Sequence, residues 1–101
     1  MNRAELERAW AVTRNHLESA CRQLPKESPS DEVAQRRVRY REWLDQNELG
    51  LALEELIFIG DELVANGLQL PAGVWSELAA AASNMQLEQK AASCRQKELA
   101  K

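Results

Sequence analysis

The acidic side chains have the clearest capacity for chemistry in this sequence, and many of them fall in one stretch. Residues 45–67, DQNELGLALEELIFIGDELVANG, contain no lysine or arginine and six acids: Asp45, Glu48, Glu54, Glu55, Asp61 and Glu62. Two adjacent pairs, Glu54–Glu55 and Asp61–Glu62, are seven residues apart, about two turns of a helix. That spacing aligns Glu54 with Asp61 and Glu55 with Glu62 in two rows along a helix, where carboxylates could ligate a metal or attract a positively charged partner.

The other groups that catalysis or metal binding would require are missing. No histidine follows the paired acids in the E-x-x-H arrangement of di-iron helical bundles. The sequence also lacks the signature of a serine–histidine–aspartate set, a cysteine–histidine metal site, a phosphate-binding glycine loop or a dinucleotide fingerprint. We therefore predict that the protein is not an enzyme and holds no metal or cofactor, and we interpret the acids as a surface for a basic partner.

The formal charge falls into three blocks, although the net value is only −3. Residues 1–41 carry +3, residues 42–89 carry −9 without one lysine or arginine, and residues 90–101 carry +3. A surface of one sign steers oppositely charged partners toward it and raises the association rate. The acidic middle block therefore predicts a basic binding partner.

Three other reactive side chains fit structural roles. His16, the only histidine, lies at the edge of the apolar stripe of the first predicted helix, and the spacing places no acid or cysteine beside it. Cys21 and Cys94 are predicted to be free, buried thiols, because no export signal is apparent and no apolar run is long enough to span a membrane. The expected location is therefore the reducing cytoplasm.

Composition predicts an all-α fold. Alanine, leucine, glutamate, glutamine and arginine favour helices and dominate the 101 residues, which include only three prolines and four glycines. A chain of this length suits one domain with one core. The expected architecture is a single helical domain, residues 1–101, folded as a compact bundle of four to five helices whose last turn frays.

Two helices are predicted in the first half of the chain. The first covers about Arg3–Leu24, with Asn2 as its N-cap and Pro25 directly after its end. The second begins after a serine cap, which is either Ser28 or Ser30.

The second half of the chain begins with a third helix over about Glu48–Asn66, with Asn47 as its cap and Gly67 at its end. Gly50 leaves open whether the second and third helices join through a kink. A fourth helix begins near Pro71. A polar last segment either continues it or follows a break.

A helical wheel of the third helix leaves one ambiguity that matters for function. One half of the wheel is an ordinary apolar face, and the acids lie along both edges of the other half. Leu51 and Phe58, seven residues apart, lie between the two rows of acids. Two interpretations stay open: both side chains pack beneath another helix, or they form an exposed apolar ridge suited to a protein interface.

Two segments give the chain a resemblance to a known family. EWLDQNELGLALEEL (Glu42–Leu56) fits the pattern E-[WF]-[LI]-x-x-N-E-[LYF]-x-L-A-L-[ED]-x-L, and PAGVWSELAAAASNMQL (Pro71–Leu87) has a tryptophan, small residues and M-x-L. Both segments resemble small helical immunity proteins of bacterial polymorphic-toxin systems, of the contact-dependent growth inhibition and Maf kinds. The resemblance implies an inhibitor that blocks a cognate toxin, often a basic nuclease, inside the producing cell. It carries over no toxin-binding residue.

We therefore expect a stoichiometric inhibitor that neutralises the basic C-terminal domain of a toxin through an acidic helix face. The residues expected to contact the toxin lie on that face, on its ridge or just before it: Asp45, Glu48, Leu51, Glu54, Glu55, Phe58, Asp61 and Glu62.

Two alternatives from other functional classes stay open. One is a domain that binds nucleic acid through four arginines: Arg36, Arg37, Arg39 and Arg41. The net negative charge of the protein disfavours this alternative, because it repels the phosphates of nucleic acid. Phosphate binding also favours a concentrated basic face. The other is an adaptor that forms a homodimer through the ridge of Leu51 and Phe58. No membrane partner is expected.

Overall fold

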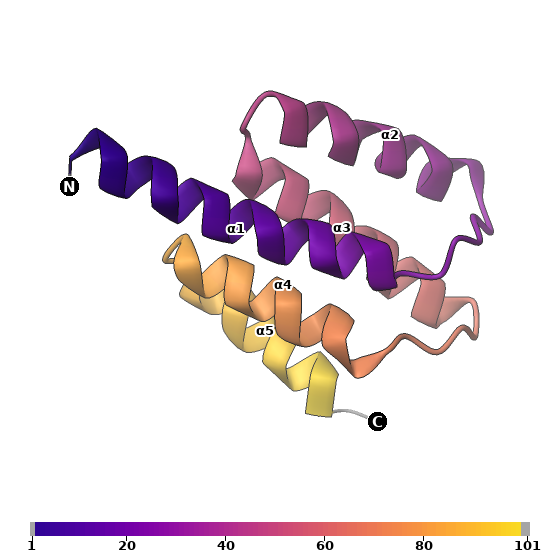
Figure 1. Cartoon of the computed structure of the whole chain (residues 1–101). Helices are drawn as coiled ribbons and strands as arrows, with labels where there is room; N and C mark the ends of the chain where they lie inside the picture. Colours follow the sequence, from indigo (N-terminus) through magenta and orange to yellow (C-terminus); the bar gives the residue numbers. More distant parts are fainter. Residues whose placement is uncertain (1, 100–101) are drawn as a thin grey trace.

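The computed structural model describes residues 2–99, which form five helices joined by short connections (Figure 1). Their bounds are α1 (Arg3–Gln23), α2 (Asp31–Asp45), α3 (Leu49–Ala65), α4 (Ala72–Asn84) and α5 (Glu88–Leu99). No strand occurs within these residues, and the predicted all-α bundle of four to five helices is confirmed.

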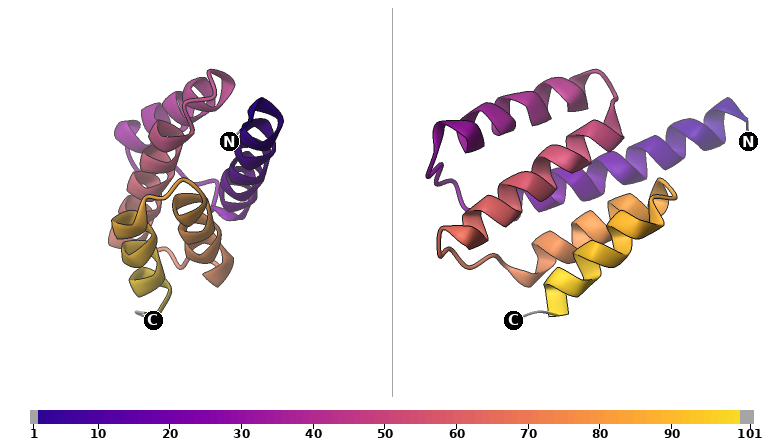
Figure 2. Two further views of the ribbon diagram at one scale, coloured as in Figure 1. Left: turned by 90° about the vertical axis from the view of Figure 1, so that its left-hand side faces the viewer. Right: turned by 180° about the vertical axis from the view of Figure 1, so that it is seen from behind.

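The helices are arranged in two layers. Seen end-on, α1 and α4 lie together on one side, and α2, α3 and α5 lie on the other (Figure 2). Within the second layer, α3 lies between α2 and α5 (Figure 2). The longest helix is α1, with 21 residues, and its first turns extend past the turns that join α2 to α3 and α4 to α5 (Figure 1).

The apolar face of α3 forms the middle of the core. Leu56, Ile59 and Leu63 recur at spacings of three and four, and all three are fully buried. Each such side chain contributes about 1.5–3 kcal/mol relative to its exposed state. Helix α4 approaches α3 closely at Gly60, where a Cβ atom would lie 2.8 Å from Cη2 of Trp75. The core therefore fixes which sides of α3 face α2, α5 and the solvent.

The predicted N-caps of α1 and α2 are confirmed. Asn2 Oδ1 accepts the backbone N–H three residues later at 2.8 Å, and Ser30 Oγ does the same at 3.2 Å. Between the two candidate serines, Ser30 is therefore the cap. Ser28 Oγ instead accepts a hydrogen bond from Arg37 Nε at 3.1 Å. A serine or asparagine cap stabilises a helix by about 1 kcal/mol relative to alanine.

The α2–α3 and α4–α5 hairpins share one kind of turn. Each contains a residue in the left-handed region, Asn47 with φ 58° and Gln86 with φ 63°. The N–H of the next residue, Glu48 or Leu87, bonds to the carbonyl five residues earlier, which is a Schellman motif. The prediction that Asn47 caps α3 is therefore wrong, since Asn47 follows the end of α2 and Glu48 is the N-cap residue of α3. Helices α2 and α3 are separate, which answers the question that Gly50 left open.

The C-terminal segment forms α5 after a break at the α4–α5 turn. The prediction that the last turn frays concerns the end of the chain, where residues 100 and 101 lie outside the described part. Within residues 2–99, no helix combines the length and the apolar character needed to cross a membrane.

Candidate protein-binding surface

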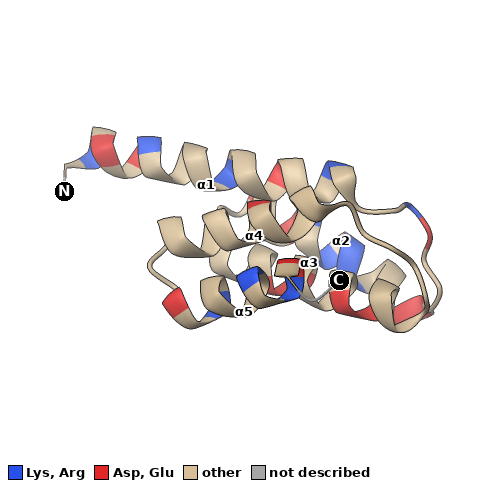
Figure 3. Ribbon diagram, turned by 90° about the horizontal axis from the view of Figure 1, so that it is seen from below, with Lys and Arg blue, Asp and Glu red and all other residues tan. Residues whose placement is uncertain are grey.

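Two acids of α3 are paired with lysines of α5. Lys90 Nζ lies 3.2 Å from Glu54 Oε1, and Lys97 Nζ lies 2.9 Å from Asp61 Oδ2. The two acids are seven residues apart, and so are the two lysines, so the ion pairs lie about two helical turns apart along α3 and α5. Figure 3 shows acidic and basic positions of these two helices close together. Exposed pairs of this kind contribute at most about 1 kcal/mol each. Their larger effect is to neutralise two of the six acids expected to bind a partner.

Glu55 is buried, so the prediction that it lies on an exposed acidic face is wrong. The residue is only 4% exposed, and its Oε1 accepts a 2.7 Å hydrogen bond from Arg36 Nη1 on α2. A buried carboxylate requires such a partner, because an unpaired charge in the protein interior is costly. The hydrogen bond to Glu55 also raises the pKa of Arg36 above its ordinary value. Glu55 therefore joins α2 to α3 and is not accessible to a partner in this structure.

Leu51 and Phe58 do not form a continuous exposed ridge. Phe58 is half-buried beneath the guanidinium of Arg36, whose Cζ lies 4.1 Å from the ring centroid. This is a cation–π contact rather than packing beneath a helix. Leu51, one end of the expected ridge, is 39% exposed. Neither interpretation of the wheel holds for both residues: Phe58 is half-buried under an arginine side chain, and Leu51 is open to solvent.

Asp45 and Glu48 keep the exposure that the sequence predicted. They lie at the turn between α2 and α3, which we call the acidic turn (residues 45–48). No cation of residues 2–99 lies within ion-pair distance of either carboxylate. Glu42, one turn earlier on α2, is also exposed, and Glu62 on α3 is half-buried. The fully exposed acids of the predicted site that make no ion pair therefore lie at the start of α3, near Leu51.

Arg14 of α1 holds the acidic turn in place. Its Nη2 donates a 2.7 Å hydrogen bond to the carbonyl of Leu44 and a longer one, 3.4 Å, to Oδ1 of Asn47. A carbonyl bonded by a charged donor is held more firmly than one bonded by a neutral donor. The turn is thus tied to α1 as well as to its own helices. Sequence reasoning did not single out Arg14, because no spacing rule relates it to a turn about thirty residues further along the chain.

The projecting end of α1 adds apolar surface near the acidic turn. Trp10 precedes Arg14 by one helical turn, and Leu6 precedes Trp10 by another, so the three share one side of α1. Both apolar side chains are exposed, Leu6 to 37% and Trp10 to 36%. An apolar strip beside exposed acids is typical of a protein interface.

The arginines of α2 do not form one basic face. Arg36 is bonded to Glu55, and Arg37 Nη2 donates to the carbonyls of Pro25 at 2.7 Å and Glu27 at 2.8 Å. Arg37 therefore fixes the connection between α1 and α2. Arg39 and Arg41 are exposed. Two exposed arginines are fewer than the concentrated patch that phosphate binding favours, so this geometry gives the nucleic-acid alternative little support.

His16, Cys21 and Cys94 occupy structural positions. His16 is half-buried between α1 and α4, with Nδ1 3.4 Å from Oε1 of Glu77. Both thiols are free, as predicted, with Cys94 fully buried and Cys21 half-buried. Burial raises the pKa of the Cys94 thiol, which keeps it protonated and poorly nucleophilic at neutral pH.

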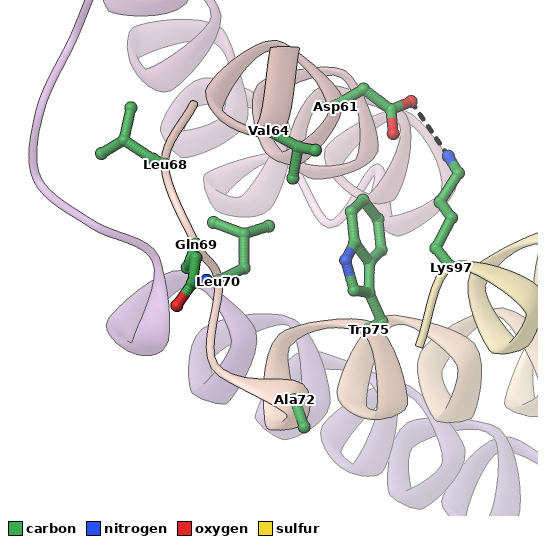
Figure 4. A pocket seen from close by; sticks show the side chains of 8 residues that line it. All are labelled: Asp61, Val64, Leu68, Gln69, Leu70, Ala72, Trp75 and Lys97. Atoms are coloured by element: carbon green, nitrogen blue, oxygen red, sulfur yellow. Dashed lines mark hydrogen bonds and ion pairs between the residues drawn. The ribbon is translucent and has the colours of Figure 1, made fainter. Parts of the chain in front are cut away.

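Two hollows lie along the groove between α3 and α5. The smaller, about 270 Å³, is lined by Glu54, Ile57, Phe58, Asp61, Lys90 and Ser93. The larger, about 440 Å³, is lined by Asp61, Val64, Leu68, Gln69, Leu70, Ala72, Trp75 and Lys97 (Figure 4).

The arrangement offers a partner three kinds of contact: the carboxylates of the acidic turn, the apolar strip of α1 and the hollows beside α3.

Within residues 2–99, no group of three or more histidine, cysteine, aspartate or glutamate side chains is placed to hold a metal ion. Comparison of the chain with protein-family models, with curated proteins and with solved structures gives no match.

Proposed function

We propose that this protein is an immunity protein that binds a cognate toxin as a stoichiometric inhibitor in the cytoplasm of the producing cell. The proposal rests on the resemblance of residues 42–56 and 71–87 to small helical immunity proteins of polymorphic-toxin systems. Its physical support is a surface that combines exposed acids with exposed apolar side chains. Such a surface suits a basic protein partner, because the apolar residues supply desolvated contact and the acids supply charge selectivity.

The acidic turn is the observation that carries the proposal. Asp45 and Glu48 are exposed without an ion-pair partner in the described chain, while Arg14 anchors the turn between them to α1. A turn that is already held loses less conformational entropy when it binds, so more of the contact energy appears as affinity. Charges at the edge of an interface act mainly on the association rate and on partner choice.

The binding face that we propose is therefore smaller than the acidic helix face expected from the sequence. Asp45, Glu48 and Leu51 form its acidic and apolar centre, and Trp10 extends it onto α1. Glu54 and Asp61 could take part only after exchange with lysines of this chain. Glu55 and Phe58 support the surface from within, since Arg36 covers both of them.

A titration tests the class of function. The toxin domain encoded beside this gene is assayed for its own activity while the purified protein is added in increasing amounts. We expect activity to fall linearly to zero at a one-to-one ratio, with no further change over time, because a stoichiometric inhibitor does not turn over. Inactivation that continues at substoichiometric amounts would instead indicate an enzyme, and unaffected toxin activity at excess protein would reject the proposal.

A further inference from the structure

The larger hollow beside α3 is an apolar pocket with one charged edge. It opens between the end of α3, the α3–α4 connection and α5, and its volume of about 440 Å³ is in the range of small-ligand sites (Figure 4). Its apolar walls come from Val64, Leu68, Leu70, Ala72 and Trp75. Asp61 and Lys97 form the charged edge, and Figure 4 shows the two side chains meeting above the Trp75 ring.

The charged edge already holds a cation, which is the ammonium of Lys97. Its Nζ lies 2.9 Å from Oδ2 of Asp61 and 4.9 Å from the ring centroid of Trp75. A carboxylate and an aromatic face that meet at one point favour a cation, because both present negative charge to it. The position of Lys97 shows that the edge can accommodate a primary ammonium on a long aliphatic stem.

We propose that this pocket is a subsite for one long cationic side chain, lysine or arginine, of a protein partner, and that Lys97 occupies its charged edge in the free protein. The incoming stem lies against the apolar walls. The incoming ammonium or guanidinium takes over Asp61, and Lys97 moves into solvent. Arginine suits the exchange particularly well, since its planar head can bond a carboxylate with two donors and stack on an aromatic ring.

Lys97 is held weakly enough for this exchange. It is close to Leu99, the exposed last described residue of α5, and its ammonium makes one ion pair to a half-exposed carboxylate and one cation–π contact with Trp75. Exposed pairs of this kind contribute little to stability, because water solvates both partners when they separate. Cys94, one turn before Lys97, is fully buried and keeps α5 anchored when the lysine side chain moves.

The identity of the partner rests on the proposed function, because a toxin with a basic surface would supply the cationic side chain. Its chemistry can be tested without the toxin. The probe is n-butylguanidinium, which carries the head group of arginine on a four-carbon chain, and the comparison is 1-pentanol, which has a similar length and no charge. The indole N–H signal of Trp75 reports binding in ¹⁵N-labelled protein, and its assignment comes from Trp75→Phe.

We expect n-butylguanidinium to shift the Trp75 indole signal and to bind more tightly than 1-pentanol. Lys97→Met, which keeps an aliphatic stem and removes the charge, should tighten guanidinium binding by roughly two- to fivefold, the factor that one exposed ion pair corresponds to. Asp61→Asn should abolish the difference between the two probes. Glu54→Gln is the matched control, because Glu54 is a paired acid on the same edge of α3 that does not line this pocket.

Equal binding of 1-pentanol and n-butylguanidinium to the Lys97→Met variant would overturn the proposal and leave only an apolar pocket. Guanidinium affinity that does not change in Lys97→Met would overturn the exchange with Lys97. The test separates this inference from the proposed function: probe binding beside a failed toxin titration rejects only the immunity role, and toxin inhibition without probe binding rejects only the subsite.

Discussion

Replacing Glu55 by alanine is expected to lower the free energy of unfolding by about 2 kcal/mol, whereas Glu54→Ala should change it by no more than about 0.5 kcal/mol. The two residues are neighbours on α3, and each forms an ion pair with a cation of another helix. Glu55 is 4% exposed, while the Glu54 side chain is 53% exposed. A charge-assisted hydrogen bond to a buried group is worth more than an exposed pair, because water does not replace it.

The loss at Glu55 should fall in the lower part of the range for charged hydrogen bonds. The Arg36 side chain is 30% exposed, so its guanidinium is hydrated again once Glu55 is removed. Urea unfolding followed by far-ultraviolet circular dichroism at neutral pH measures both variants. Because both substitutions put alanine inside the same helix, their effects on helix propensity cancel in the comparison. Equal losses at the two positions would show that the Arg36–Glu55 pair is as well solvated as the Lys90–Glu54 pair.

Alanine at Gly60 and alanine at Gly50 should change stability in opposite directions. Both glycines belong to α3, where alanine is favoured over glycine by up to about 1 kcal/mol. At Gly50, the second residue of α3, a Cβ has no atom within 4 Å, so a gain of up to about 0.5 kcal/mol is expected. At Gly60, the Cβ would lie 2.8 Å from Cη2 and 3.2 Å from Cζ2 of Trp75.

Overpacking at Gly60 should exceed the gain in helix propensity. Forcing a methyl group against a buried ring typically costs about 1–3 kcal/mol, so Gly60→Ala is expected to destabilise the protein by about 1 kcal/mol or more. Thermal and urea unfolding of the two variants give the sign directly. The tryptophan fluorescence of Gly60→Ala should change as well, since Trp75 must shift. Stabilisation by both substitutions would contradict the close packing of α4 on α3.

Much of the fold could be predicted from the sequence, because caps and apolar spacing are local features. Asn2 and Ser30 cap helices as expected, and the Leu56–Leu63 face of α3 is buried as its spacing indicated. The error at Asn47 has a physical reason. Asparagine is favoured both at N-caps and in the left-handed conformation that ends a helix, so residue type alone does not distinguish the two positions.

The candidate site was predicted less well, because charge compensation depends on which helices become neighbours. The block of nine acids in residues 42–89 has no base of its own, yet Arg36 from the preceding block and Lys90 and Lys97 from the following one pair with three of them. Periodicity predicts which side of a helix a residue occupies, but it does not predict which helix lies there. The anchoring of the acidic turn by Arg14 was missed for the same reason.

The affinity of a charge-reversed acidic turn for the proposed cognate toxin domain tests the account most directly. Isothermal titration calorimetry at several salt concentrations measures the affinity of two double variants, Asp45→Lys/Glu48→Lys and the control Glu27→Lys/Glu32→Lys. The second variant reverses two exposed acids, one in the connection before α2 and one in the first turn of α2, and changes the net charge equally. We predict that the acidic-turn variant loses about tenfold or more in affinity and most of the salt dependence, while the control stays close to wild type. Wild-type affinity in the acidic-turn variant, or an equal loss in both, would contradict the account.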